Sequence, residues 1–289
     1  MRPVTRIPKL YLWENQLLFL AASYMPYREH TVVSDKLIVS IQGEMTITLD
    51  DGRQITTRSC LVRAGMVLKK ECIDATNAVT SIYYLAPMTQ DYLALESIMP
   101  KAIEGVNYAH PQEEYLVQQL LRVRDDNLSP QQAYLLLRNL IVQPHLSHVI
   151  FKKFDPRIIE IIRRIRETVR ENVSVVDLAE EVNLSESRLE KLFKDQIGVP
   201  ITRYRLRYRV FVGTIYIAFG HSVTDAGFAA GFASSAHFSK SFSSINGIPP
   251  SATFLKPPFL EMKIADEVYE MMAPRMDNMP IKKIMATNQ

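Results

Sequence analysis

A stretch near the C-terminal end of the chain occurs twice, and this repeat limits the folds open to the sequence more than any other feature. The segment 184–193 aligns with 233–242. The match resumes beyond them, where the residues 198–200 (Gly-Val-Pro) align with 247–249 (Gly-Ile-Pro). A segment that recurs in this way predicts one supersecondary unit that the chain builds twice.

Each copy carries the start signals of two short helices. Ser174 and Asp177 have the spacing of a helix N-cap and its third residue, and Ser185 is placed to cap a second helix. Ser222 and Asp225 repeat the first of these signals. Apolar residues at helical spacing follow in both copies. The sequence therefore predicts two helix-turn-helix units.

The segment between the units, 201–218, predicts one long helix. Roughly 17 residues of helix at 1.5 Å per residue span about 26 Å. Such a helix can hold two recognition helices apart. Recognition helices about 34 Å apart can enter successive major grooves on one face of DNA. We therefore expect the chain to bind double-stranded promoter DNA.

The distribution of charge along the chain supports this prediction better than the net charge does. The net charge is only +3, and residues 1–155 carry 16 basic and 16 acidic side chains. Residues 185–256, in contrast, carry nine basic and four acidic side chains. A local positive excess is typical of a module that contacts phosphate groups.

The first part of the chain has the pattern of short strands. Apolar and polar residues alternate over 44–49, and Asp51 and Gly52 supply a turn of the kind that closes hairpins. Further strand-like runs lie at 59–63 and 79–85. Strands of this number and spacing predict a small β-barrel or jelly roll.

The apolar spacing becomes helical from about residue 90. Two amphipathic segments, around 115–123 and 133–141, predict a helical hairpin packed on the strands. Residues 112–148, which include this hairpin, are the best candidate for a homodimer contact.

We thus expect an α+β protein with an N-terminal domain over 1–150 and an all-helical domain over 156–256. An extension over 257–289 follows, with a short amphipathic helix expected over 259–272.

The ordered motifs of the C-terminal region resemble the DNA-binding domain of AraC/XylS-type transcription regulators over 156–254. The motifs are Ser185, Leu189, Phe193, Lys194, Gly198, Pro200, Tyr204 and Arg209, then Gly231, Phe232, His237, Phe238, Ser239, Lys240, Phe242, Gly247 and Pro249. This resemblance implies a sequence-specific transcription regulator. More loosely, the N-terminal strands resemble the cupin-like domain that many members use to sense a small effector or to dimerise.

The chain departs from the family pattern at three places in the second unit. Ala226-Gly227 replaces the usual Ile-Ala, and glycine costs about 1 kcal/mol against alanine within a helix. A basic pair is replaced by Ser243-Ser244, and the closing Tyr-Arg by Phe254-Leu255. With fewer charges there, we expect the first unit to supply more of the base reading.

The resemblance also implies roles for individual side chains. Base-edge contacts are expected from Ser187, Arg188, Glu190 and Lys191 in the first unit and from Ser235, Ala236, Ser239 and Lys240 in the second. Phosphate contacts are expected from Lys194, Arg203, Arg205 and Arg207. Arg209 is expected to brace the two units rather than to touch DNA.

The residues needed for catalysis are missing from the sequence pattern. His30 is the only histidine before His110, so the two-His-plus-Glu cluster of catalytic cupins cannot be assembled. Cys60 and Cys72 have no metal-type spacing. We therefore expect no enzyme activity, no metal and no cofactor.

Two alternatives stay open. One is a cupin-type enzyme fused to a DNA-binding module, and the other is a ligand-independent regulator controlled by a protein partner. RNA polymerase is a candidate partner of any such regulator.

The sequence lacks both an apolar run of about 20 residues and a signal peptide, so we expect a cytoplasmic protein without membrane contact.

Overall fold

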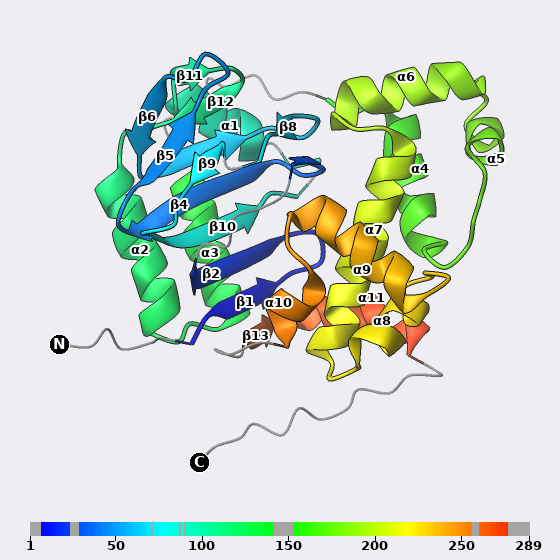
Figure 1. The fold of residues 1–289 in the computed structure, drawn as a ribbon. Helices are drawn as coiled ribbons and strands as arrows, with labels where there is room; N and C mark the ends of the chain where they lie inside the picture. Colours follow the sequence, from blue (N-terminus) through cyan, green and yellow to red (C-terminus); the bar gives the residue numbers. More distant parts are fainter. Residues whose placement is uncertain are drawn as a thin grey trace.

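The protein has a strand-rich N-terminal part and a helical C-terminal part, which lie side by side (Figure 1). The computed structural model describes residues 7–23, 29–70, 72–86, 88–89, 91–141, 153–255 and 260–276. The prediction of an α+β chain with a strand-rich N-terminal part and a helical C-terminal part is confirmed. The jelly-roll path of the strands, and domain limits at residues 150 and 156, remain predictions.

An eight-stranded sheet in the order β11-β12-β7-β4-β10-β2-β1-β13 forms the framework of the N-terminal part, accompanied by the small sheets β3-β8 and β6-β5-β9. The strands are β1 (Lys9–Leu12), β2 (Leu17–Ser23), β3 (His30–Thr31), β4 (Lys36–Gln42), β5 (Met45–Thr48), β6 (Gln54–Thr57), β7 (Ser59–Val62), β8 (Val67–Leu68), β9 (Ile73–Asp74), β10 (Val79–Tyr84), β11 (Lys101–Ile103), β12 (Val106–Tyr108) and β13 (Glu261–Ile264). β4 lies between β7 and β10, and all its side chains except that of Gln42 are buried.

Three helices accompany these strands: α1 (Asp91–Ile98), α2 (Glu113–Asp125) and α3 (Pro130–Ile141). α2 and α3 are the helical hairpin that the apolar spacing predicts, and their buried residues belong to the same apolar core as those of the sheet. Tyr11 of β1 and Trp13, which directly follows this strand, hold the hairpin: the Tyr11 hydroxyl donates to the carbonyl oxygen of Val123 (3.1 Å), and Trp13 Nε1 donates to that of Pro130 (3.0 Å). Residues 142–148 of the expected dimer contact lie outside the described residues.

The helices of the C-terminal part are α4 (Pro156–Glu167), α5 (Val175–Glu181), α6 (Glu186–Ile197), α7 (Ile201–Ala218), α8 (Val223–Ala229), α9 (Ser235–Asn246), α10 (Pro250–Phe254) and α11 (Asp266–Met272), which is followed by the 3-10 helix Ala273–Arg275. The long helix expected over 201–218 is therefore present as α7. The α5–α6 pair lies at one end of α7 and the α8–α9 pair toward the other (Figure 1). Nearly every residue of α7 from Tyr208 onward is buried, as expected for a helix that is apolar all round.

The two parts of the chain share one apolar core. A single cluster of buried side chains includes Leu10 and Tyr11 of β1 together with Val210 and Phe211 of α7. A second cluster fills the space among α4, α5, α6 and the start of α7. Among the described residues, no helix is both long enough and apolar enough to cross a membrane.

The structure corrects the prediction of a helix over 259–272. Glu261–Ile264 form the strand β13, and helix α11 begins only at Asp266. β13 pairs in parallel with β1, which would otherwise be an edge strand of the sheet. A local apolar pattern cannot reveal this pairing, because the partner strand lies at the opposite end of the sequence.

Candidate nucleic-acid interface

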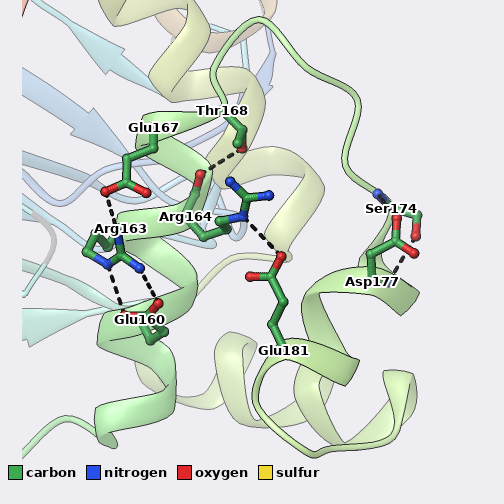
Figure 2. Close-up of polar contacts among 8 residues, drawn as sticks. All are labelled: Glu160, Arg163, Arg164, Glu167, Thr168, Ser174, Asp177 and Glu181. Carbon is green, nitrogen blue, oxygen red and sulfur yellow. Dashed lines mark hydrogen bonds and ion pairs between the residues drawn. The ribbon is translucent and has the colours of Figure 1, made fainter.

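The first helix-turn-helix unit is built by the local signals that the sequence shows. The Ser174 hydroxyl accepts from the amide of Asp177 (3.0 Å), and the Asp177 carboxylate accepts from the amide of Ser174 (3.2 Å), so α5 starts with a complete capping box (Figure 2). Ser185 caps α6 by accepting from the amide of Arg188 (3.4 Å). α6 ends at Gly198, whose φ of +87° suits glycine.

Helix α4 packs against the first helix-turn-helix unit. Arg164 Nε donates to Glu181 Oε1 of α5 at 3.0 Å, and Arg163 pairs with Glu160 and Glu167 along α4 itself (Figure 2). These groups are largely exposed, so the ion pairs contribute little stability. The unit is held mainly by its apolar core, in which α4 packs with Leu189 and Phe193 of α6.

The second unit repeats the same construction. The Ser222 hydroxyl accepts from the amide of Asp225 (3.1 Å), and the Ser234 hydroxyl accepts from the amide of His237 (3.1 Å) at the start of α9. Gly231, between α8 and α9, has a φ of +86°, which glycine adopts without strain. α9 ends at Gly247, again in the left-handed conformation.

Gly227 is unfavourable for helix formation, but it allows helices α8 and α9 to pack closely. A Cβ atom on Gly227 would lie only 2.9 Å from Cβ of Phe238, so α8 can approach α9 this closely only without a side chain at this position. The departure from the family pattern at this residue therefore goes with tighter packing inside the second unit.

Arg209, which the family resemblance assigns to bracing the two units, joins α7 to the loop that precedes α5. It is buried in α7, and its guanidinium donates to the carbonyl oxygens of Val169 and Glu171, each at 2.7 Å. These residues belong to the loop that precedes α5 of the first unit. Their neighbour Arg170 touches the second unit, because a Cβ on Gly231 would lie 2.9 Å from its Cα.

The reading face of α6 is open to solvent. Its five candidate residues are all exposed, namely Ser187, Arg188, Glu190, Lys191 and Lys194. On α9, Ala236 and Lys240 are exposed, whereas Ser235 and Ser239 are half-buried. The Ser235 hydroxyl lies 3.3 Å from that of Thr224 on α8, so it has a partner within its own unit.

The arginines of α7 do not share one surface. Arg203 is exposed, and Arg205 is half-buried with one guanidinium nitrogen that has no hydrogen-bond partner among the described residues. Arg207 lies elsewhere, because its side chain lines a pocket between the two parts of the chain. The structure therefore does not group Arg207 with the other candidates for phosphate contact.

This pocket lies between strands β1, β2, β4 and β10 on one side and helices α7, α9 and α10 on the other. It has about 1110 Å³ of empty space, part of which is open to solvent. Its walls are mainly apolar and include Leu10, Phe19, Ile82, Val210, Phe211 and Phe254. Two basic side chains, Lys36 and Arg207, also line it.

Lys36 is an unusual residue for such a place. Its side chain is 4% exposed, and Nζ lies 5.8 Å from the ring centroid of Tyr84. Burial lowers the pKa of Lys36 to about 8. The neighbouring Asp35 accepts from the amide of Ala64 (2.7 Å), but its own burial raises the pKa of this carboxyl group.

Sequence reasoning missed this pocket. Lys36 begins the strand β4, in which four of the six other residues are apolar. A charged residue at the start of a strand that is buried on both faces was the available signal. The other wall comes from α7, α9 and α10, so only the tertiary arrangement places Arg207 and Lys36 in the lining of one pocket.

Comparison with known proteins places the C-terminal helices in a family. Residues 178–256 match the model of a helix-turn-helix domain. The C-terminal part of the chain therefore contains a helix-turn-helix domain of the AraC type. Over 97 residues the chain is 30% identical to the HTH-type transcriptional regulator GbdR of Pseudomonas aeruginosa, a match that covers 33% of this chain and only 26% of that regulator.

Solved structures resemble the chain over a greater length. An apo form of ToxT from Vibrio cholerae has a TM-score of 0.54 at 12% identity, covering 83% of this chain and 97% of ToxT. Wild-type ToxT bound to an unsaturated fatty acid has the same TM-score at 13% identity, covering 83% of this chain and 96% of ToxT. At such low identity the likeness concerns the fold alone.

Proposed function

We propose that this protein is a sequence-specific DNA-binding transcription regulator whose two helix-turn-helix units read one promoter site. The observation that carries the proposal is the pair of capped units on α7, each of which presents polar side chains to solvent on its second helix. Such helices bind in the major groove, with their outward side chains toward base edges.

The roles of the side chains follow from their chemistry and exposure. In the first unit, Arg188 and Lys191 can donate to guanine and Glu190 can accept from cytosine, while Ala236 of the second unit can pack on a thymine methyl group. Lys194 and Arg203 are placed for phosphate, which fixes register without reading sequence. We leave Arg207 out of this interface because it lines the pocket.

A salt titration tests DNA binding directly. Fluorescence anisotropy with a labelled duplex should show an affinity that falls steeply with salt, by a log–log slope of about 0.9 for each phosphate contacted. The double variant Lys191→Ala/Lys194→Ala should bind more weakly. Lys101→Ala, which removes an exposed cation of the N-terminal part, is the matched control. Equal losses in both variants, or binding that does not respond to salt, would contradict the proposal.

We further propose that the pocket binds a small effector with a carboxylate and an extended apolar body. Its apolar walls fit such a body, and Lys36 and Arg207 supply positive charge for the carboxylate. ToxT structures of this fold contain an unsaturated fatty acid or (E)-4-(8-methylnaphthalen-1-yl)but-3-enoic acid, both carboxylic acids with apolar bodies. The proposed effector would lie between the two parts of the chain.

An effector in this position would contact both α7 and α9. It can influence DNA binding only if it binds one arrangement of the two parts more tightly than another. The position of the pocket supports such a coupling, because one wall belongs to the sheet and the other to the helix that spaces the two units.

Displacement of a fluorescent fatty acid tests the effector site. Lys36→Met keeps the size of the side chain and removes its charge, so we expect binding to weaken by at least the factor of about ten that 1.4 kcal/mol represents. Lys101→Ala should bind like the unaltered chain. If Lys36→Met binds the probe equally well, the assignment of the carboxylate site is wrong.

Other features of the regulator remain proposals. Exposed apolar side chains on α2 and α3, Tyr115 and Leu135, are each 52% exposed and support a homodimer contact there. Sedimentation of Leu135→Glu against the unaltered chain would test it. We assign no residue to a contact with RNA polymerase. Among the described residues, no group of three or more His, Cys, Asp or Glu is placed to hold a metal ion, so no observation favours the enzyme alternative.

A further inference from the structure

The segment 260–276 follows the second helix-turn-helix unit and has no place in the proposed DNA interface. Its first half is β13, at the edge of the eight-stranded sheet, and its second half is α11 with the 3-10 helix Ala273–Arg275. We propose that this segment is an intramolecular clasp. It ties the strand-rich part to the helical part and so sets the width of the pocket between them.

One end of the clasp is bound to the sheet. β13 pairs in parallel with β1 over the full length of both strands. The amide of Glu261 donates to the carbonyl oxygen of Pro8 (2.9 Å), and that of Ala265 donates to the carbonyl oxygen of Leu12 (3.0 Å). An edge strand offers unpaired backbone groups along its length, and an added strand satisfies them. Here the added strand is the chain's own C-terminal segment.

The other end of the clasp is buried against the helices. Val268 and Met272 of α11 have no exposed surface and belong to the core that includes α7. The ring of Tyr269 stacks on that of Phe219, directly after α7, with centroids 5.2 Å apart. Burial of two such apolar side chains removes their surface from water and so stabilises the contact.

Polar contacts fasten the same end to α4 and α7. The Arg275 guanidinium donates to the carbonyl oxygen of Arg166 on α4 at 2.7 Å. In return, the Tyr216 hydroxyl on α7 donates to the carbonyl oxygen of Arg275 at 3.2 Å. The clasp therefore holds helices of the C-terminal part at two separate points.

The elements that the clasp joins are also walls of the pocket. Leu10 of β1 lines one side, and Val210 and Phe211 of α7 line the other. Because the clasp spans from β1 to α7, these walls can move apart only if one end of the clasp detaches. It thus limits the size of ligand that fits, and it transmits a change at the sheet to α7. The consequence for DNA binding rests on the proposed function, whereas the clasp itself does not.

Two proline variants in the full chain test the clasp. The amides of Glu261 and Ala265 face β1, and since a strand turns alternate amides to one neighbour, that of Lys263 faces it too. Lys263→Pro therefore removes a donor from the middle of the pairing. Asp266→Pro is the matched control, because this residue is the first of α11, where proline is tolerated.

Spin labels report the result as a distance. They are attached at Arg53→Cys on the strand-rich part and Glu180→Cys on α5, both exposed positions, with Cys72→Ser to prevent labelling there. We expect a narrow distribution of distances by double electron–electron resonance in the parent and in Asp266→Pro. Lys263→Pro should shift and broaden it.

Arg275→Ala releases the opposite end and provides a second, independent reading. It should broaden the distribution as well, while circular dichroism shows unchanged helix content. Narrow distributions in both Lys263→Pro and Arg275→Ala would overturn the clasp. Because the measurement uses no DNA, failure of the parent chain to bind DNA would contradict the proposed function and leave this result unaffected.

Discussion

Gly65, in the loop between β7 and β8, lies directly against the backbone of Gly198, the residue that ends α6. A Cβ atom on Gly65 would come within 2.7 Å of the carbonyl oxygen of Gly198. Gly65 also has a φ of +94°, which side-chain-bearing residues rarely adopt. At this point the strand-rich part touches the end of the first reading helix.

Gly65→Ala should therefore push the two parts of the chain apart. Gly52→Ala is the matched control, since Gly52 has a φ of +84° but no atom within 4 Å of its Cβ position. Both variants carry backbone strain of about 1 to 2 kcal/mol, and only Gly65→Ala adds the steric clash. Urea denaturation should show the larger loss of unfolding free energy for Gly65→Ala; equal losses would mean that this contact has no role.

Gly227→Ala should lower stability, although alanine is the better helix former by about 1 kcal/mol. The added methyl group would collide with Phe238, and overpacking costs about 1 to 3 kcal/mol. Thermal unfolding of Gly227→Ala should thus show a lower Tm. A higher Tm for Gly227→Ala would contradict this and show that α8 and α9 can separate freely.

Lys36→Met should make the ligand-free chain more stable at pH 7. Burial lowers the pKa of Lys36 to about 8 from its usual 10.5, so the unfolded chain holds this proton more tightly than the folded chain. Below pH 8 the folded chain carries the full cost of the buried charge, on the order of 3 kcal/mol at 1.36 kcal/mol per pKa unit. This cost disappears as the pH rises from 8 toward 10.5.

Urea denaturation at several pH values checks this prediction. The gain in unfolding free energy of Lys36→Met over the parent should be largest at pH 7 and shrink toward pH 10. For the same reason, the parent should lose affinity for a carboxylate ligand as the pH rises through 8. If the gain in unfolding free energy is constant across this pH range, the charge of Lys36 is exposed to solvent and the prediction is wrong.

The features that local signals determine could be predicted from the sequence. Ser174, Ser185 and Ser222 mark helix starts through hydrogen bonds to residues three positions ahead, and the structure contains these bonds. The apolar spacing of α2 and α3 is likewise local, and both helices are present. The two helix-turn-helix units follow from such signals.

Features that depend on remote partners were not predictable. β13 is a strand only because β1 presents an edge to it, and its sequence alone fits a helix as well. Arg207 has the same chemistry as Arg203, yet α7 turns it toward the pocket rather than toward solvent. The pocket needs the packing of both parts, which no pattern within one segment encodes.

Lys191→Ala and Arg203→Ala should separate base reading from phosphate contact. Loss of Lys191 should relax preference at one position, by about 1 to 3 kcal/mol between the right and the wrong base pair. Loss of Arg203 should weaken all duplexes alike and reduce the salt slope by about 1. Anisotropy titrations with matched and mismatched duplexes decide this, and the same pattern of loss in both variants would refute the division of roles.

If α6 and α9 bind one DNA site together, selection of binding sequences from a pool of random duplexes will show it most directly. We expect two enriched blocks of sequence, with centres about 10 to 10.5 base pairs apart. The Lys191→Ala chain should lose preference within one block and keep the other. Enrichment of a single block, or of no sequence, would contradict joint binding by α6 and α9.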